Sequence, residues 1–173
     1  GRTGKWFGYE HYRMSPDIVA CGKGLGNGYP VSAVSSSETM AEAFGKNPFR
    51  YAQSHQNDPL GCAVAMGVIK ELDRTNLIRR TEEEGILFKS LLKKICNKHN
   101  QIKEIRGKGL MLAMAFNTEE NAKQVHQFLL EHRIICGQKQ NILRFMPPLK
   151  IEHELIQQVT QTIEMAMNDP GTV

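Results

Sequence analysis

A single lysine stands among four glycines in the stretch ACGKGLGNGYPVSAV, which covers residues 20–34. Glycine permits positive φ and the close approach of a bulky group, so glycines at every second position from Gly22 to Gly28 indicate a loop shaped around a ligand. A lysine amine forms a Schiff base with a carbonyl compound once the amine is uncharged. Lys23 is therefore a candidate for covalent catalysis, and a surface turn with a solvated lysine is the alternative.

Two nucleotide-binding patterns do not fit this loop. A P-loop requires GxxxxGK followed by serine or threonine, whereas Lys23 is followed by Gly24, and Asp17 stands where the first glycine should be. A dinucleotide fingerprint requires GxGxxG at the start of a helix, whereas these glycines lead into Tyr29, Pro30 and a strand-like run. The loop is thus not a phosphate cradle of either kind.

A lone arginine occupies the apolar stretch NILRFMPPL. Arg144 has isoleucine, leucine, phenylalanine and methionine around it, so the guanidinium requires an anionic partner. Arginine binds a carboxylate through two parallel hydrogen bonds, which suits it to recognise a carboxylate substrate. A structural ion pair with an acid of the protein itself is the alternative.

Polar residues precede a helix of small residues in the stretch YAQSHQNDPLGCAVA. Helix N-termini and hydroxyl groups bind phosphate, which makes this stretch a candidate phosphate site. Ordinary capping of the helix by Asn57 or Asp58 is the alternative.

Composition limits the class of protein. The chain has 173 residues, of which 40% are hydrophobic and 23% charged, and its net charge of +4 is dispersed, so a nucleic-acid partner is not expected. The four cysteines lie far apart without metal-ligand spacing, which indicates buried, reduced thiols. No apolar run has the length of a membrane span, so we expect no membrane partner and a cytoplasmic location.

The surrounding sequence predicts an α/β chain whose last part is a β-β-α-β-α unit. The expected strands are residues 17–20, 31–35, 102–106, 110–116 and 142–145. Three helices are expected at residues 37–45, 119–133 and 152–167. Two more are expected between them: a buried helix that begins at Asp58, and a helix that begins with the capping box of Thr81 and Glu84 and runs to about His99.

The stretch GRTGKWFGYEHYRMSPDIVACGKGLGNGYPVSAV resembles the cofactor-lysine region of the class III pyridoxal-phosphate aminotransferases, which include the ornithine, 4-aminobutyrate and acetylornithine types. The stretches NDPLGCAVA, RGKGLMLAMAF and LRFMPPL follow in the family's order, so the resemblance covers essentially the whole chain. It implies the aspartate-aminotransferase-like fold. Residues 1–75 would end the large domain that binds the cofactor, and residues 76–173 would form the small α+β domain.

The resemblance also implies roles for three residues. Lys23 would hold pyridoxal 5'-phosphate as a Schiff base and carry a proton during the reaction. Ser54 stands where the family has a threonine that contacts the cofactor phosphate of the partner subunit, and His55 replaces the usual phenylalanine or tyrosine. Arg144 would bind the substrate carboxylate, although in some members its counterpart pairs with an internal glutamate.

The expected activity is transfer of an amino group from an amino donor to a 2-oxo acid by a cytoplasmic homodimer. In the family, the acid that pairs with the pyridine nitrogen and the loop that holds the phosphate lie before the GRTG segment. The sequence therefore indicates the C-terminal portion of a longer enzyme, inactive by itself. An aminomutase or racemase with the same lysine, or a noncatalytic small-domain module, is the alternative.

Overall fold

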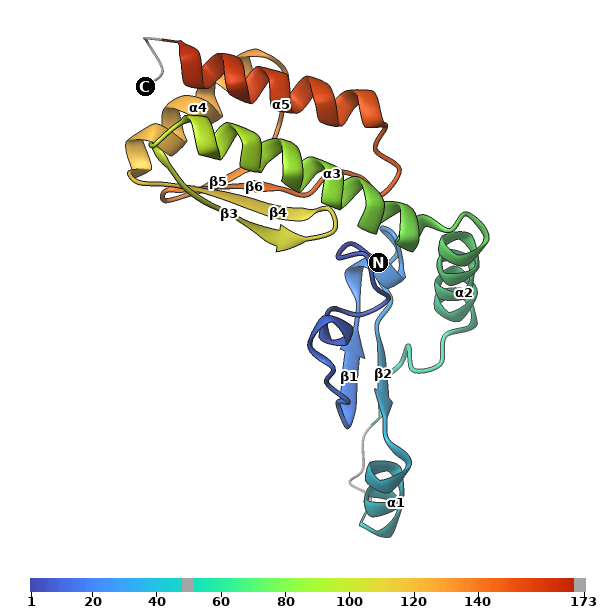
Figure 1. Ribbon diagram of the computed structural model, residues 1–173. Coiled ribbons are helices and arrows are strands. Elements are labelled where there is room, and N and C mark those ends of the chain that lie inside the picture. Colours follow the sequence, from blue (N-terminus) through green and yellow to red (C-terminus); the bar gives the residue numbers. More distant parts are fainter. Residues whose placement is uncertain (48–51, 170–173) are drawn as a thin grey trace. The chain divides into compact units, whose positions relative to one another are not determined.

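The protein forms two compact units in a computed structural model that describes residues 1–47 and 52–169 (Figure 1). One unit comprises Tyr9–Asn76 and contains Lys23, so we call it the lysine unit. The other comprises Gly1–Gly8 with Leu77–Val173 and contains Arg144, so we call it the arginine unit. The first eight residues thus belong with the C-terminal part of the chain.

The lysine unit is built around a pair of antiparallel strands. Its elements are the short 3-10 helix η1 (Gly8–Tyr12), strand β1 (Ile18–Cys21), the 3-10 turn η2 (Lys23–Leu25), strand β2 (Ala33–Ser36) and helices α1 (Glu38–Lys46) and α2 (Pro59–Arg74). Ile18 pairs with Ser36 and Cys21 with Ala33, so the connection between the strands carries Lys23. The prediction of a glycine loop between two strands is confirmed. Strand β2 begins later than expected, after a turn in which the Val31 amide donates to the Tyr29 carbonyl at 2.9 Å.

Local capping chemistry sets the start of both helices in this unit. The Ser37 hydroxyl accepts a hydrogen bond from the Met40 amide at 3.4 Å, as its position before α1 predicts. The Asp58 carboxylate accepts one from the Gly61 amide at 2.9 Å at the start of α2. The expected stop at Gly45 is wrong, because α1 continues through that residue to Lys46.

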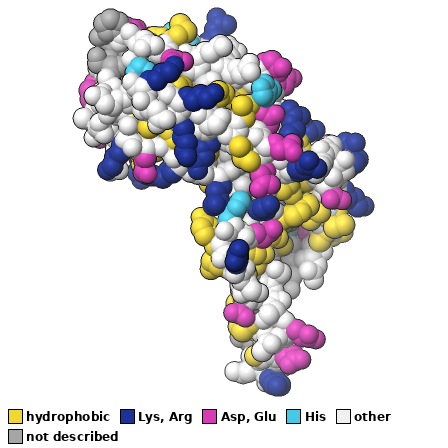
Figure 2. All heavy atoms as spheres, in the orientation of Figure 1, with side chains coloured by type: hydrophobic (Ala, Val, Ile, Leu, Met, Phe, Trp, Pro, Cys, Tyr) yellow, Lys and Arg dark blue, Asp and Glu magenta, His cyan; other side chains and the backbone are white. Residues whose placement is uncertain are grey.

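The expected burial of α2 is also wrong for this chain. Gly61 is its single buried residue, and Leu60, Met66 and Ile69 are exposed. Figure 2 shows hydrophobic side chains at the surface of this part of the molecule. Small residues permit close packing on several sides, but they do not supply the neighbour, and within the described residues no element covers this face. Cys62 on α2 is likewise exposed, which corrects the expectation that the thiols are buried, although all four cysteines are free.

The arginine unit is a four-stranded antiparallel sheet covered on one face by helices (Figure 1). The strands are β3 (Ile102–Lys108), β4 (Met111–Phe116), β5 (Gly137–Lys139) and β6 (Ile142–Phe145), in the order β3-β4-β6-β5. The helices are α3 (Leu77–Lys98), α4 (Glu119–Glu131) and α5 (His153–Asn168). This is the predicted β-β-α-β-α arrangement with β5 added.

A hydrophobic core lies between the sheet and the helices. Alternate residues of β4 and β6 point into it, as the period of two in a strand requires. The rings of Phe88 on α3 and Phe145 on β6 meet edge to face with centroids 5.5 Å apart. The fully buried side chains include Leu92, Leu110, Leu112, Met114, Phe116, Val125, Leu129, Leu143, Ile156 and Ile163. Leu143 and Phe145 are buried on either side of Arg144, so Arg144 projects from the opposite face of β6.

The predicted capping box of Thr81 and Glu84 is wrong. Helix α3 begins at Leu77, and Thr81 is fully buried inside it, with a hydroxyl that has no hydrogen-bond partner among residues 1–47 and 52–169. A box four residues into a helix caps nothing, because the amides there already bond within the helix. Ile86 of α3 and Leu155 of α5 are exposed, so neither contributes to the core.

Candidate functional site

Lys23 lies at the start of the turn between β1 and β2, in a backbone conformation that is uncommon for lysine. Its φ is +46°, in the left-handed region that a side chain adopts at some cost. Two amides that follow it, those of Gly26 and Asn27, donate to its carbonyl at 3.1 and 3.2 Å and hold it there. Its side chain is exposed, and within the described residues the amine has no hydrogen-bond or ion-pair partner.

Lys23 opens onto a hollow formed by its own loop. The hollow has a volume of about 510 Å³ and is lined by residues 23–24 and 27–31. Space beside Gly24 and Gly28 is empty, since a Cβ added to either would meet no atom within 4 Å. Gly26 is different, because a Cβ there would lie 1.9 Å from the Tyr29 carbonyl oxygen. The loop thus folds tightly at Gly26 and leaves room beside the lysine.

The N-terminus of α2 packs against the same loop. The Tyr29 hydroxyl lies 3.5 Å from the Asp58 carboxylate, and a Cβ on Gly61 would lie 3.4 Å from Val31. Ser54 is exposed in the turn at residues 54–57 that leads into this helix end. The helix N-terminus itself is capped by Asp58, which is the capping that the sequence offered as the alternative to a phosphate site. An anion in this region would therefore rely on the Ser54 hydroxyl more than on the helix amides.

Arg144 lies on β6 in the arginine unit, where it is opposite Ala113 of β4 and Gly137 of β5. Its guanidinium extends across Gly137, since a Cβ added there would lie 3.4 Å from Nε and Nη2. The side chain is exposed, and no acid among residues 1–47 and 52–169 forms an ion pair with it. Within this part of the chain, the guanidinium is free to bind an external anion.

Apolar side chains border Arg144. It lines a hollow of about 390 Å³ together with residues 134–137, residues 145–148 and side chains of α3 and α5. Cys136 is part of this wall, and burial raises the pKa of its thiol to about 11. The thiol is therefore neutral near neutral pH, and it adds no negative charge beside the arginine.

The three predicted site residues fall in two units. Lys23 and Ser54 belong to the lysine unit, and Arg144 belongs to the arginine unit. The sequence analysis did not identify Tyr29, whose hydroxyl lies beside the Asp58 carboxylate. The feature that could have identified it is its position next to Pro30, just after the glycines. No helix among the described residues combines the length and the hydropathy of a membrane span.

The sequence matches the family Aminotransferase class-III over residues 1–167. Acetylornithine aminotransferase of Caldanaerobacter subterraneus subsp. tengcongensis is 35% identical over 169 residues, which cover 98% of this chain and 42% of that protein. Ornithine aminotransferase 1 of Staphylococcus aureus is 37% identical over 95% of this chain and 41% of its own length. Leucine/methionine racemase of Thermococcus litoralis is 34% identical over 98% of this chain and 40% of its own length.

The fold of this chain matches solved structures of aminotransferases. The crystal structure of acetylornithine aminotransferase from Elizabethkingia anophelis matches with a TM-score of 0.86 and 32% identity, over 96% of this chain and 42% of that chain. An S-selective transaminase from Bacillus megaterium has the same fold with a TM-score of 0.88 at 24% identity, over 97% of this chain and 41% of that one. The chain thus spans about two fifths of the length of the relatives that it matches.

Proposed function

This chain belongs to the class-III aminotransferase family, and on that premise we propose that the enzyme containing it transfers an amino group from an amino donor to a 2-oxo acid. The observation that carries the proposal is the amine of Lys23, which has no partner among the described residues and lies at the edge of an open hollow. The backbone holds Lys23 at a φ of +46°, and strain of this kind concentrates at functional sites.

We propose that the cofactor is pyridoxal 5'-phosphate, as the family implies. The residues present fit it, because Lys23 offers a primary amine, the space beside Gly24 is empty, and Ser54 offers an exposed hydroxyl. Lys23 would hold the carbonyl carbon of the cofactor, and Ser54 would donate to its phosphate, in the partner subunit if the enzyme is a homodimer. When bound, this cofactor withdraws electrons from the substrate Cα and so makes its proton acidic.

The remaining chemistry belongs to side chains of this chain. The Nζ amine of Lys23 is a base able to take the proton from the substrate Cα and return it to another carbon. Arg144 would bind the substrate carboxylate through two parallel hydrogen bonds and so fix the orientation of the substrate. The free guanidinium of Arg144 within the described residues supports this role.

The test is substitution of Lys23 in the enzyme that contains this chain. We expect Lys23→Ala to abolish covalent attachment of the cofactor and amino transfer, because no other group replaces both functions. Lys70→Ala provides the control, since Lys70 is another exposed lysine of the same unit. After borohydride reduction, peptide mapping should place the cofactor on Lys23. A cofactor attached to a different lysine would overturn the assignment.

For the 173-residue chain alone, we propose weak cofactor binding without amino transfer. The chain spans 42% of the acetylornithine aminotransferase that it matches, and the resemblance assigns the acid and the phosphate loop of the cofactor site to residues before the GRTG segment. Titration of the chain with pyridoxal 5'-phosphate, followed by assays with several amino donors, tests this. Turnover by the chain alone would contradict it.

A racemase is the second candidate, favoured by the 34% identity to leucine/methionine racemase of Thermococcus litoralis. A racemase uses the lysine amine in the same way but returns the proton to the same carbon. Incubating the enzyme with one enantiomer in the absence of a 2-oxo acid separates the two. Appearance of the opposite enantiomer would indicate a racemase, and no reaction until a 2-oxo acid is added would indicate a transferase.

We also propose a cytoplasmic homodimer for the enzyme. The four free cysteines support a reducing compartment. The exposed apolar residues of α2 support burial of that helix against chain not described here or against a second subunit. Light scattering of the whole enzyme gives its subunit number directly.

A further inference from the structure

The segment Gly1–Gly8 is tied to the arginine unit by hydrogen bonds at its beginning. The Leu110 amide, between β3 and β4, donates to the Arg2 carbonyl at 2.9 Å. The Arg2 guanidinium donates to the Pro147 carbonyl at 2.5 Å. Arg2 therefore links the β3-β4 turn to the chain that follows β6.

Glycines allow this segment to lie directly on the unit. Gly109 has a φ of +51°, and a Cβ added to it would lie 2.4 Å from the Thr3 carbonyl carbon. Gly4 has a φ of +84°, and a Cβ there would lie 2.7 Å from Cβ of Glu82 on α3. Both positions thus require glycine for conformation and for space. The contact is close enough to fix the segment's position.

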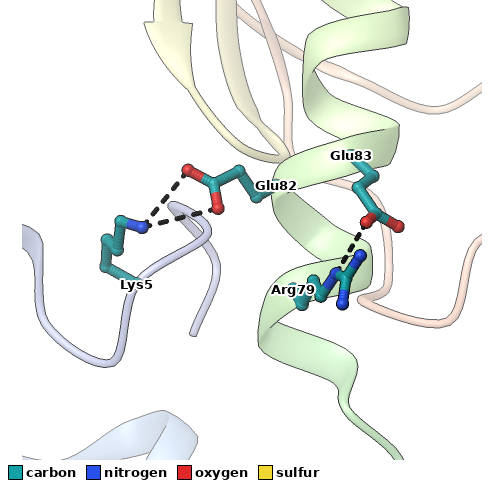
Figure 3. Close-up of polar contacts among 4 residues, drawn as sticks. All are labelled: Lys5, Arg79, Glu82 and Glu83. Atoms are coloured by element: carbon teal, nitrogen blue, oxygen red, sulfur yellow. Dashed lines mark hydrogen bonds and ion pairs between the residues drawn. The ribbon is translucent and has the colours of Figure 1, made fainter.

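An ion pair continues the attachment along the segment. The Lys5 ammonium lies 3.4 Å from the Glu82 carboxylate of α3 (Figure 3). Figure 3 also shows Arg79 and Glu83, which pair at 2.9 Å within α3 and involve no residue of the segment. The first pair joins the segment to the helix, whereas the second is a surface pair of the helix alone.

The chain after β6 leaves the sheet close to Arg144. Pairing of β6 ends at Arg144 with β5 and at Phe145 with β4, and Pro147 and Pro148 have no amide hydrogen to donate. Another side-chain hydrogen bond reaches this chain farther on, where the Arg80 guanidinium donates to the Ile151 carbonyl at 2.9 Å. Arg2 contacts this chain three residues after Arg144. Because the Arg144 guanidinium must meet a carboxylate in a defined direction, movement of the strand end would displace it.

We propose that Arg2 is a positioning residue for Arg144, acting by fixing the chain that follows β6 through its hydrogen bond to Pro147. The catalytic consequence rests on the proposed function, in which Arg144 binds the substrate carboxylate. Arg2 contacts neither substrate nor cofactor in this role. Its removal should affect the affinity for the substrate and leave attachment of the cofactor to Lys23 intact.

The test compares Arg2→Ala with Arg2→Lys and Arg79→Ala in the enzyme that contains this chain. In Arg2→Ala we expect the KM for the amino donor to rise roughly fivefold, the equivalent of one hydrogen bond, with kcat nearly unchanged. Arg2→Lys should recover part of the loss, because lysine can still donate to Pro147. Arg79→Ala removes an equal charge from the same unit and should leave the KM for the amino donor unchanged. On an Arg144→Ala background, Arg2→Ala should add no further rise in KM.

Amide hydrogen exchange supplies a readout independent of activity. We expect residues 142–151 to exchange faster in Arg2→Ala than in the wild type, while residues 119–131 of α4 stay unchanged. Unchanged exchange at residues 142–151, or a KM that stays constant although Arg144→Ala raises it, would overturn the proposal. If Arg144→Ala itself leaves KM unaltered, the role proposed for Arg144 fails, and the exchange rates still decide whether Arg2 holds the strand end.

Discussion

Two helical glycines should respond in opposite directions to the same substitution. Gly85 lies in α3 and is buried, and a Cβ added to it would lie 2.3 to 2.4 Å from backbone atoms of Gly109. Gly67 lies in α2, and a Cβ there would meet no atom within 4 Å. Intrinsic helix propensity favours alanine over glycine at both positions. The surroundings therefore decide the sign of the change in stability.

The magnitudes follow from the two environments. At Gly67, alanine should increase the free energy of unfolding by about 0.5–1 kcal/mol, because it restricts the unfolded chain and costs nothing in the helix. At Gly85, the same gain is opposed by overpacking that costs about 3 kcal/mol. This is the upper end of the usual cost of overpacking, because the backbone at Gly109 must move. The net loss is about 2 kcal/mol, which lowers Tm by about 8 °C for a unit of this size.

Thermal unfolding of the 173-residue chain measures both effects. Trp6 is its single tryptophan and belongs to the arginine unit, so tryptophan fluorescence follows the unit that contains Gly85. Far-UV circular dichroism adds the helix signal of α2 for the Gly67→Ala variant. If Gly85→Ala is as stable as the wild type, the close packing of α3 on Gly109 is refuted. The support that this packing gives to the Arg2 segment would fall with it.

Two further outcomes follow from the site. Arg144→Lys should raise the KM for the amino donor by some tens of fold, equivalent to about 2 kcal/mol, because a point charge does not reproduce a two-bond carboxylate contact; unchanged KM with a lower Tm would make Arg144 structural. Alkylation by iodoacetamide at pH 8 should label exposed Cys62 first and Cys136 last, as mass spectrometry can follow, because the raised pKa of about 11 leaves the Cys136 thiol protonated at that pH. The rate at Cys136 should increase as the pH rises toward 11, and equal rates at pH 8 would contradict the burial of Cys136.

The sequence predicted features that depend on neighbouring residues. Ser37 caps α1 and Asp58 caps α2, as their residue types and positions predict, because a cap needs only a side chain and an amide three residues later. Arg144 was placed on its strand because the residues around it alternate correctly with the core. Lys23 was placed in its loop because glycines and strand formers flank it. The class and order of most elements were therefore predictable.

Features that depend on distant partners were not predictable. Thr81 has the spacing of a capping box with Glu84, but the core of the arginine unit buries it within α3. Strand β5 has only three residues and no apolar alternation, so pairing with β6 alone defines it. The prediction that α2 is buried is wrong because burial requires a neighbouring element, and the local sequence does not specify one. The role of Arg2 depends on a carbonyl 145 residues away in the chain.

The glycines around Lys23 separate into two positions that the fold requires and two that it does not. Gly26 must be glycine because the Tyr29 carbonyl lies against it, and Gly28 because its φ is +110°. Gly22 and Gly24 have neither constraint, since the φ of each lies outside the left-handed region, a Cβ on Gly22 would lie 3.8 Å from its nearest neighbour, and the space beside Gly24 is empty. A glycine in the turn costs conformational entropy on folding, so one that serves neither conformation nor packing is best explained by a ligand. Gly24 follows Lys23 directly, which supports the proposal that the cofactor ring occupies that space.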